Sequence, residues 1–317
     1  DVCLLRPKSP TQSSGLMQAI FESSIVRQQL EDCMVGSTFR RVNVQQVKEL
    51  VVPVPTTKAE QEAIAGALSD ADGLIESLEQ LIAKKRHIKQ GAMQELLTGK
   101  RRLPGFQVKP GYKQTEVGVI PEDWELSPLR LSTAVITKGT TPTSVGHSYK
   151  DRGINFVKAE SISNTGTLIA EKLAFIDDET HAVFRRSQLR ESDLLVSIAG
   201  VLGRIGVIRM EDLPANTNQA VAIVRLDSTA NLDRTYLFHY LRGTAIRTQI
   251  EDANVQAAQA NLSLANVGNF LIAAPTVYGE QDAIAGVLSD MDAEIEALST
   301  RLAKARQVKQ GMMHELL

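Results

Sequence analysis

The sequence predicts an α+β protein, in which a mixed α/β domain accompanies two long helices that pair as an antiparallel coiled coil. Two observations predict this fold class. Residues 60–97 recur as residues 280–317 without a gap, and 23 of the 38 positions are identical. Between the copies, residues 112–277 contain short runs rich in Val and Ile, bounded by Gly, Asn, Asp and Ser, which are typical of strands. A repeat of this period is too long for a solenoid, so the chain holds two copies of a domain segment followed by its helix.

The apolar positions of both repeated segments step by four and three residues, as in the seam of a two-stranded coiled coil. Each segment would extend about 57 Å at 1.5 Å per residue. We predict that the two seams pair with each other; the alternative is that each seam packs on its own domain. The predicted helix-pairing residues are Ile64, Leu68, Ile75, Leu78, Ile82, Ile284, Leu288, Met291, Ile295, Leu298 and Leu302.

Opposite charges are separated along each repeated segment. Residues 60–79 carry six acidic side chains and no basic one, whereas residues 84–89 carry three lysines and an arginine. Parallel pairing would set acid beside acid over half the length of the helices. Antiparallel pairing sets acid beside base throughout, so we predict an antiparallel pair.

The region between the helices begins with a basic linker, residues 98–111, that contains Pro and Gly. Strands are expected within residues 154–162, 192–200, 204–210 and 220–226, and helical spacing appears over residues 233–252. These elements together predict a mixed α/β domain.

Composition excludes several classes of function. The chain has two cysteines, which argues against a disulfide framework and favours a reducing cytoplasm. Its longest apolar run, residues 194–208, is interrupted by Arg204 and is too short to span a bilayer. The sequence shows no Walker loop, nucleophile elbow or metal-type Cys/His cluster, so we predict no catalytic residues, no metal and no enzyme activity.

Polar loops of the central domain contain the candidates for DNA contact. Lys and Arg bind phosphates, whereas Asn, Gln and Thr read base edges. Because the formal net charge is only −2, the positive charge needed for DNA must be local. The candidates are Lys138, Thr140, Thr141, Thr143, Tyr149, Lys150, Arg152, Lys158, Arg204, Asn218, Gln219, Asn254, Gln256 and Gln259.

Several motifs, in order along the chain, resemble the specificity subunit of type I restriction-modification systems, the HsdS family. They are "TEVGVIPEDWELSPL" (115–129), "DLLVSIAGVLGRIGVI" (193–208) and "KQGMMHELL" (309–317). The resemblance implies target recognition domains that each read half of a split DNA site, separated by long helices that dock the methyltransferase (modification) subunits. It also implies that S-adenosylmethionine is held by those partners, with no cofactor in this chain. DNA cleavage would belong to restriction subunits with ATP-driven translocase activity.

This resemblance divides the chain into five segments. Residues 1–57 are expected to be the C-terminal remnant of a first target recognition domain, and residues 58–97 the first long helix. The linker, residues 98–111, precedes the second target recognition domain, residues 112–277, and the second long helix, residues 278–317. By the offset of the repeat, we expect the chain to be truncated at its N-terminus.

The predicted function is sequence-specific recognition of double-stranded DNA by a non-catalytic subunit. This subunit would read a half-site of a bipartite target in a cytoplasmic complex that directs DNA methylation. The alternatives are a coiled-coil scaffold for other proteins, or a half-specificity subunit that binds DNA only as a dimer or not at all.

Overall fold

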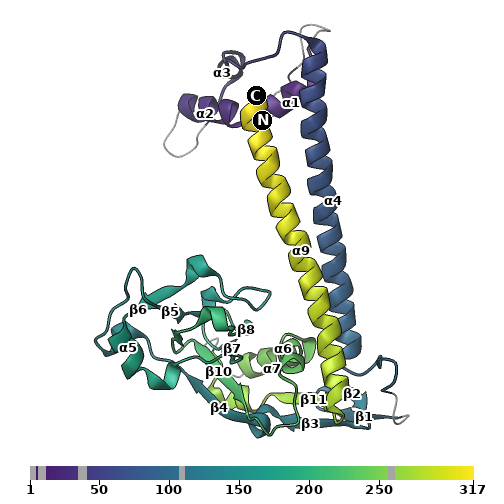
Figure 1. The fold of residues 1–317 in the computed structure, drawn as a ribbon, viewed down its shortest axis with the longest axis vertical. Helices are drawn as coiled ribbons and strands as arrows, with labels where there is room; N and C mark the ends of the chain where they lie inside the picture. Colours follow the sequence, from purple (N-terminus) through teal and green to yellow (C-terminus); the bar gives the residue numbers. More distant parts are fainter. Residues whose placement is uncertain (1–4, 6–11, 35–40, 107–110, 256–260) are drawn as a thin grey trace. The chain divides into compact units, whose positions relative to one another are not determined.

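The computed structural model describes residue 5 and residues 12–34, 41–106, 111–255 and 261–317 (Figure 1). The chain divides into two compact units. The first comprises Asp1–His87 and Ala293–Leu317, and the second Ile88–Asp292. The division crosses both long helices, α4 (Lys58–Leu96) and α9 (Tyr278–Leu316). It therefore does not coincide with the five predicted segments, which stay a prediction.

In the first unit, short helices precede α4, and the first two of them pack on its N-terminal part. These are α1 (Ser14–Glu22), α2 (Ser24–Cys33) and α3 (Val44–Lys48). The hydroxyl of Ser13 caps α1 by accepting a hydrogen bond from the Leu16 amide. A buried cluster joins Leu16, Ile20, Val26, Ile64 and Leu68, and the C-terminal Met312, Met313 and Leu317 pack against it.

The first unit also contains the contact between the two long helices, which run side by side in Figure 1. Leu78, Ile82, Ile295 and Leu298 form one buried cluster, with Leu302 packed against it. Ion pairs of 2.6 Å flank the cluster: Lys85–Glu294, Glu79–Arg306 and Asp72–Lys309. As the residue number increases along α4, the number of the residue contacted on α9 decreases, which confirms the antiparallel pair.

The second unit is built on small sheets. A four-stranded antiparallel sheet has the order β4 (Thr133–Lys138), β10 (Val221–Leu226), β7 (Leu194–Ser197), β8 (Ile205–Val207). A three-stranded sheet has the order β6 (Ala174–Ile176), β5 (Ile154–Val157), β9 (Ala215–Thr217). Two strand pairs are β1 (Tyr112–Thr115) with β2 (Gly118–Pro121), and β3 (Trp124–Pro128) with β11 (Leu271–Pro275). The helices are α5 (Asp178–Val183), α6 (Arg234–Leu241), α7 (Thr244–Val255) and α8 (Leu264–Gly268). This arrangement confirms the predicted mixed α/β domain.

Both faces of the four-stranded sheet are covered, which explains the unbroken apolar runs in β7 and β10. Leu194 and Val196 of β7 lie in the larger core, and Leu195 between them lies in a second core on the other face. The larger core includes α6 and the start of α9, where Ile284 and Leu288 have no exposed surface. Met291 packs against the same core, so these three seam residues contact the domain. Ile75 is half-buried on α4. The full set of helix-pairing residues stays a prediction.

The two copies of the repeat share local hydrogen bonds as well as sequence. Buried Gln281 accepts a hydrogen bond from the Asp233 amide at 2.7 Å and donates one to Pro275 O at 2.8 Å. Its counterpart Gln61 accepts from the Ser13 amide at 2.9 Å and donates to Pro55 O at 2.8 Å. The helices repeat at the same offset, because α1, α2 and α3 begin 220 positions before α6, α7 and α8, whereas residues 51–55, the counterpart of β11, form no strand.

Candidate nucleic-acid interface

One end of the four-stranded sheet gathers loops from distant parts of the sequence. At this end β4 finishes at Lys138 and β7 at Ser197, while β10 and β8 begin at Val221 and Ile205. The registers Lys138↔Ala222, Ser197↔Val221 and Val196↔Ile205 bring these ends together. The loops that start at residues 139 and 198, and the segment that leads from residue 218 into β10, therefore meet at one end of the sheet.

The three-stranded sheet contributes residues to the same group of strand ends. Strands β5 and β9 are parallel, with Val157 opposite Thr217, so Lys158 and Asn218 both follow at the ends of these strands. The Thr217 hydroxyl donates to Val157 O at 2.8 Å, and the Gly139 amide donates to Asn218 O at 3.1 Å. The candidates Lys138, Lys158 and Asn218 thus lie next to one another.

Gly139 makes this meeting of loops possible. A Cβ atom at residue 139 would lie 1.6 Å from Thr217 O, so only glycine permits the two backbones to approach so closely. Beyond Gly139, the Thr141 hydroxyl donates a hydrogen bond to Gln219 Oε1. The structure therefore brings together two candidates that are 78 positions apart.

A second group of candidates surrounds Lys158. Its ammonium group lies 6.0 Å from the centre of the Tyr149 ring and 3.1 Å from the Glu160 carboxylate. Arg204 donates to Ile162 O at 3.0 Å. Burial acts to raise the pKa of Glu160, but hydrogen bonds from its own backbone and Lys158, with the charge of Arg204, hold that pKa below its ordinary value. The acid is thus flanked by two cations, and the exposed Tyr149 lies at the end of the group.

The remaining candidates are less closely grouped. Lys150 forms an ion pair with Asp177 at 3.2 Å, and Thr143 and Arg152 are exposed. Asn254 is half-buried in α7. Gln256 and Gln259 lie outside the described residues. Which of these residues contact DNA stays a prediction.

Sequence reasoning overlooked one cation at this edge. Arg186 donates to the Thr140 hydroxyl at 3.3 Å, which places it beside Thr141 and Gln219. It follows α5, 46 positions after Thr140, in a segment without the Thr- and Asn-rich pattern that marked the other loops. Nothing in the linear sequence grouped Arg186 with them.

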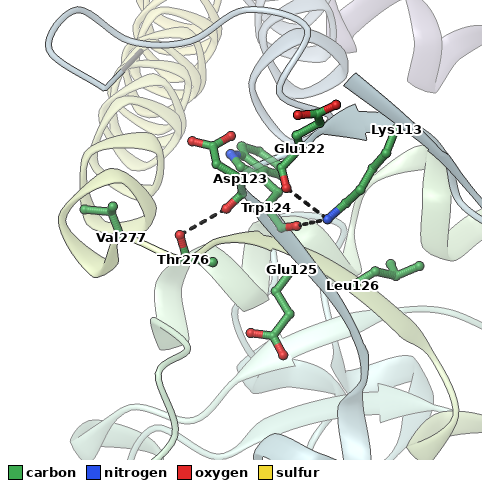
Figure 2. Close-up of a pocket in the computed structure, with 8 residues that line it drawn as sticks. All are labelled: Lys113, Glu122, Asp123, Trp124, Glu125, Leu126, Thr276 and Val277. Atoms are coloured by element: carbon green, nitrogen blue, oxygen red, sulfur yellow. Dashed lines mark hydrogen bonds between the residues drawn. The ribbon is translucent and has the colours of Figure 1, made fainter. Parts of the chain in front are cut away.

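A separate pocket near the start of the domain has the wrong charge for DNA. Figure 2 shows its lining, which includes the carboxylates of Glu122, Asp123 and Glu125. Its one lysine, Lys113, donates to the backbone oxygens of Glu122 and Trp124 at 3.1 and 2.6 Å. Asp123 is also paired with Arg102 at 2.9 Å, which leaves two further carboxylates in the lining and no basic lining residue apart from Lys113, so the pocket does not favour a polyanion.

The described residues contain no group of three or more His, Cys, Asp or Glu side chains placed to hold a metal ion. Within the same residues, none of the helices has the combined length and apolarity needed to cross a membrane. Cys33 is a free cysteine.

Comparisons with known proteins identify relatives of this chain. The specificity subunit of the type I restriction enzyme EcoBI from Escherichia coli is 25% identical over 289 residues, which are 87% of this chain and 59% of that protein. The MjaVIII specificity subunit from Methanocaldococcus jannaschii is 26% identical over 288 residues, covering 89% of this chain and 64% of its own length. The chain therefore spans about three fifths of the length of these curated relatives.

Solved structures share the fold. The crystal structure of a type I restriction-modification S subunit from M. genitalium superposes with a TM-score of 0.66 at 15% identity, covering 98% of this chain and 74% of that one. A chain from a structure that describes complex assembly and conformational transition of the type I R-M system has a TM-score of 0.55 at 15% identity, covering 96% and 71%.

The family described as "Type I restriction modification DNA specificity domain" matches residues 121–307, more than half of the chain. That match spans the gathered strand ends and most of α9. The chain belongs to the family of type I restriction-modification specificity subunits.

Proposed function

We propose that this chain recognises double-stranded DNA through the loops at the shared end of the two sheets. The observation that carries the proposal is the gathering of Lys138, Thr141, Lys158, Asn218 and Gln219 at one edge of a domain matched by the specificity family. These residues combine cations for phosphates with amides and hydroxyls that can distinguish base edges.

The roles divide according to chemistry. Lys138, Lys158 and Arg204 would contact phosphates and set the position of the domain on the duplex. Gln219 and Asn218 would read bases, because an amide can donate and accept towards one base at the same time. Asn218 Oδ1 already accepts from the Ala220 amide at 3.0 Å, which orients its NH₂ group. In this arrangement the chain reads a half-site of a bipartite target.

The paired helices would scaffold the other subunits. We propose that methyltransferase subunits dock there and hold S-adenosylmethionine, and that restriction subunits with ATP-driven translocase activity join the complex. The chain itself would remain non-catalytic and direct methylation by choosing the DNA site. The proposal is supported by the relatives, which are named specificity subunits.

Selection from a random duplex library tests DNA recognition by this chain. The wild-type chain should enrich a short sequence. Gln219→Ala should relax preference at one base pair, at a cost of about 1–3 kcal/mol for the preferred base. Lys138→Ala should weaken binding to all sequences alike and reduce the salt slope by about one.

The exposed Arg234→Ala, in the first turn of α6, serves as the control and should change neither preference nor salt slope. Absence of any enriched sequence, with methyltransferase subunits still captured by the chain, would contradict recognition and favour a protein scaffold.

A further inference from the structure

We infer that Arg185 and Arg186 form an additional DNA-contacting element, and that the buried Asn216 is the positioning residue that holds them in place. This inference rests on the proposed function and extends its binding surface to the turn that carries Arg186. The turn is the 3-10 helix Arg185–Ser187, which directly follows Phe184 at the end of α5.

Asn216, in the middle of β9, has no exposed surface, and its side chain binds both ends of this turn. Its NH₂ group donates to Phe184 O at 3.1 Å and to the Ser187 hydroxyl at 2.9 Å. A buried amide is costly unless its hydrogen bonds are made, and here both donor bonds are directed at the turn.

A third hydrogen bond of Asn216 determines that the Nδ1 atom of the neighbouring His181 carries a hydrogen. Since Phe184 O can only accept, the NH₂ group must face it and Oδ1 must face His181 Nδ1. His181 Nδ1 therefore carries a proton and donates to Asn216 Oδ1. Gln188 Nε2 in turn donates to His181 O at 2.8 Å, which joins the residues on both sides of the turn.

Backbone and ring contacts also hold the Arg185–Ser187 turn in place. The Leu189 amide donates to Ala215 O at 2.9 Å, next to Asn216. The Phe184 ring packs edge-on against His147, with 5.3 Å between ring centres. Phe184 and Ser187 are buried, whereas the two residues between them, Arg185 and Arg186, are exposed. The turn is thus anchored on each side and presents only its arginines to solvent.

These contacts place Arg186 at the candidate interface, and Arg185 precedes it in the same turn. Arg186 donates to the Thr140 hydroxyl at 3.3 Å, one residue from the Thr141–Gln219 hydrogen bond. Among the described residues, neither arginine forms an ion pair with an acid. Two exposed arginines that are neighbours in sequence suit a phosphate backbone, because each guanidinium can bind phosphate oxygens in a bidentate manner. Holding the turn rigid before binding reduces the conformational entropy lost when DNA binds.

A salt titration tests the arginines. The wild-type chain, the Arg185→Ala/Arg186→Ala double variant and Arg209→Ala would be titrated with a mixed-sequence duplex at several salt concentrations. Arg209 is a matched control, because it is exposed, pairs with Glu211 and follows the opposite end of β8. The double variant should lose roughly tenfold affinity per arginine at 0.1 M salt, with a salt slope lower by about two. Arg209→Ala should match the wild type.

The two proposals fail in different ways. No duplex binding by the wild-type chain would count against DNA recognition itself. Duplex binding by the wild type, with an unchanged affinity and salt slope in the double variant, would overturn the inference about the arginines alone.

The role of Asn216 is tested by a double-mutant cycle. Asn216→Asp keeps the shape but removes both N–H donors, and Ser187→Ala removes one partner with less risk to folding. Each should weaken duplex binding severalfold in the wild-type background and have little effect where both arginines are alanine. Equal losses in both backgrounds would show that Asn216 supports the fold only, and no loss from either variant would also overturn the positioning role.

Discussion

Lys309 Nζ of α9 lies 2.6 Å from Asp72 Oδ1 of α4, and the residues 220 positions away from them, Lys89 and Asp292, also form an ion pair. Each copy of the repeat therefore supplies one acid and one lysine, and an antiparallel arrangement makes the contact twice. The surroundings differ: Lys309 is also 3.6 Å from Glu22, whereas Asp292 is also 3.3 Å from Arg242. The sequence repeat thus specifies its own register, while the charge around each pair depends on the flanking helices.

The Lys309–Asp72 pair is expected to contribute modestly to the register of the helices. Asp72 is half-exposed, so Lys309→Asp or Asp72→Lys alone should lower the free energy of unfolding by about 1 kcal/mol or less. The double exchange should restore part of that loss, because it rebuilds the pair with reversed charges but sets the new carboxylate at position 309 beside Glu22. Denaturant unfolding of the four proteins measures the coupling, and additive losses would show that the pair contributes nothing to the register.

Arg102 should be among the most sensitive positions in the chain. Its guanidinium binds Asp123 at 2.9 and 3.0 Å and Glu280 at 2.6 Å, and Glu280 is only 1% exposed. Arg102→Ala would leave that carboxylate buried without its partner and should cost about 3–5 kcal/mol in denaturant unfolding. Arg102→Lys should also destabilise, because lysine lacks the fork that binds both acids.

The neighbouring Arg101 is exposed and supplies the control for Arg102. Arg101→Ala should change the free energy of unfolding by about 0.5 kcal/mol or less. Similar small effects at both positions would contradict a structural role for the Arg102 cluster.

His239 should make stability depend on pH below neutrality. Burial, followed by the nearby charge of Lys89, lowers its pKa to about 3; Asp292 acts in the opposite direction and Arg242 in the same one. An unfolded histidine titrates near pH 6.5, so below that pH the unfolded chain binds a proton that the folded chain does not. The stabilisation is complete above about pH 6.5 and is lost as the pH falls towards about 3.

Denaturant unfolding between pH 6 and pH 4 measures this dependence. For the wild type, one extra proton bound by the unfolded state contributes about 1.4 kcal/mol per pH unit. His239→Gln should remove that contribution, whereas His87→Gln, at an exposed position of α4, should leave it. An identical pH slope for the wild type and His239→Gln would refute the assignment.

Gly139 should be intolerant of a side chain. In Gly139→Ala the new Cβ would collide with Thr217 O, which should destabilise the domain by about 1–3 kcal/mol and separate Thr141 from Gln219. The midpoint temperature of thermal unfolding and the affinity for duplex DNA should both decrease. Gly73→Ala, in the middle of α4 with no atom near its Cβ, should instead stabilise by about 0.5–1 kcal/mol. Full duplex affinity in Gly139→Ala would place the DNA surface elsewhere.

The sequence alone determined the long helices and their direction. The spacing of apolar residues within each segment predicts a seam such as Leu78 and Ile82 opposite Ile295 and Leu298. The separation of acidic from basic residues along each segment favours antiparallel pairing. The central domain was also predictable as mixed α/β, because runs such as residues 194–197 carry the composition of buried strands. These properties depend on neighbours within a few turns or one strand, which a linear pattern records.

Only the tertiary structure decided which seam residues contact the domain and which loops share an edge. Ile284 has the same spacing as Leu298, yet it lies in the domain core because α6 covers that part of α9. Arg186 and Thr140 meet because both of their segments contact β9 and the residue after it: Asn216 binds the turn of Arg186, and Asn218 O accepts from the Gly139 amide. Spacing within one segment reveals which residues share a face, whereas the partner of that face depends on how distant segments pack.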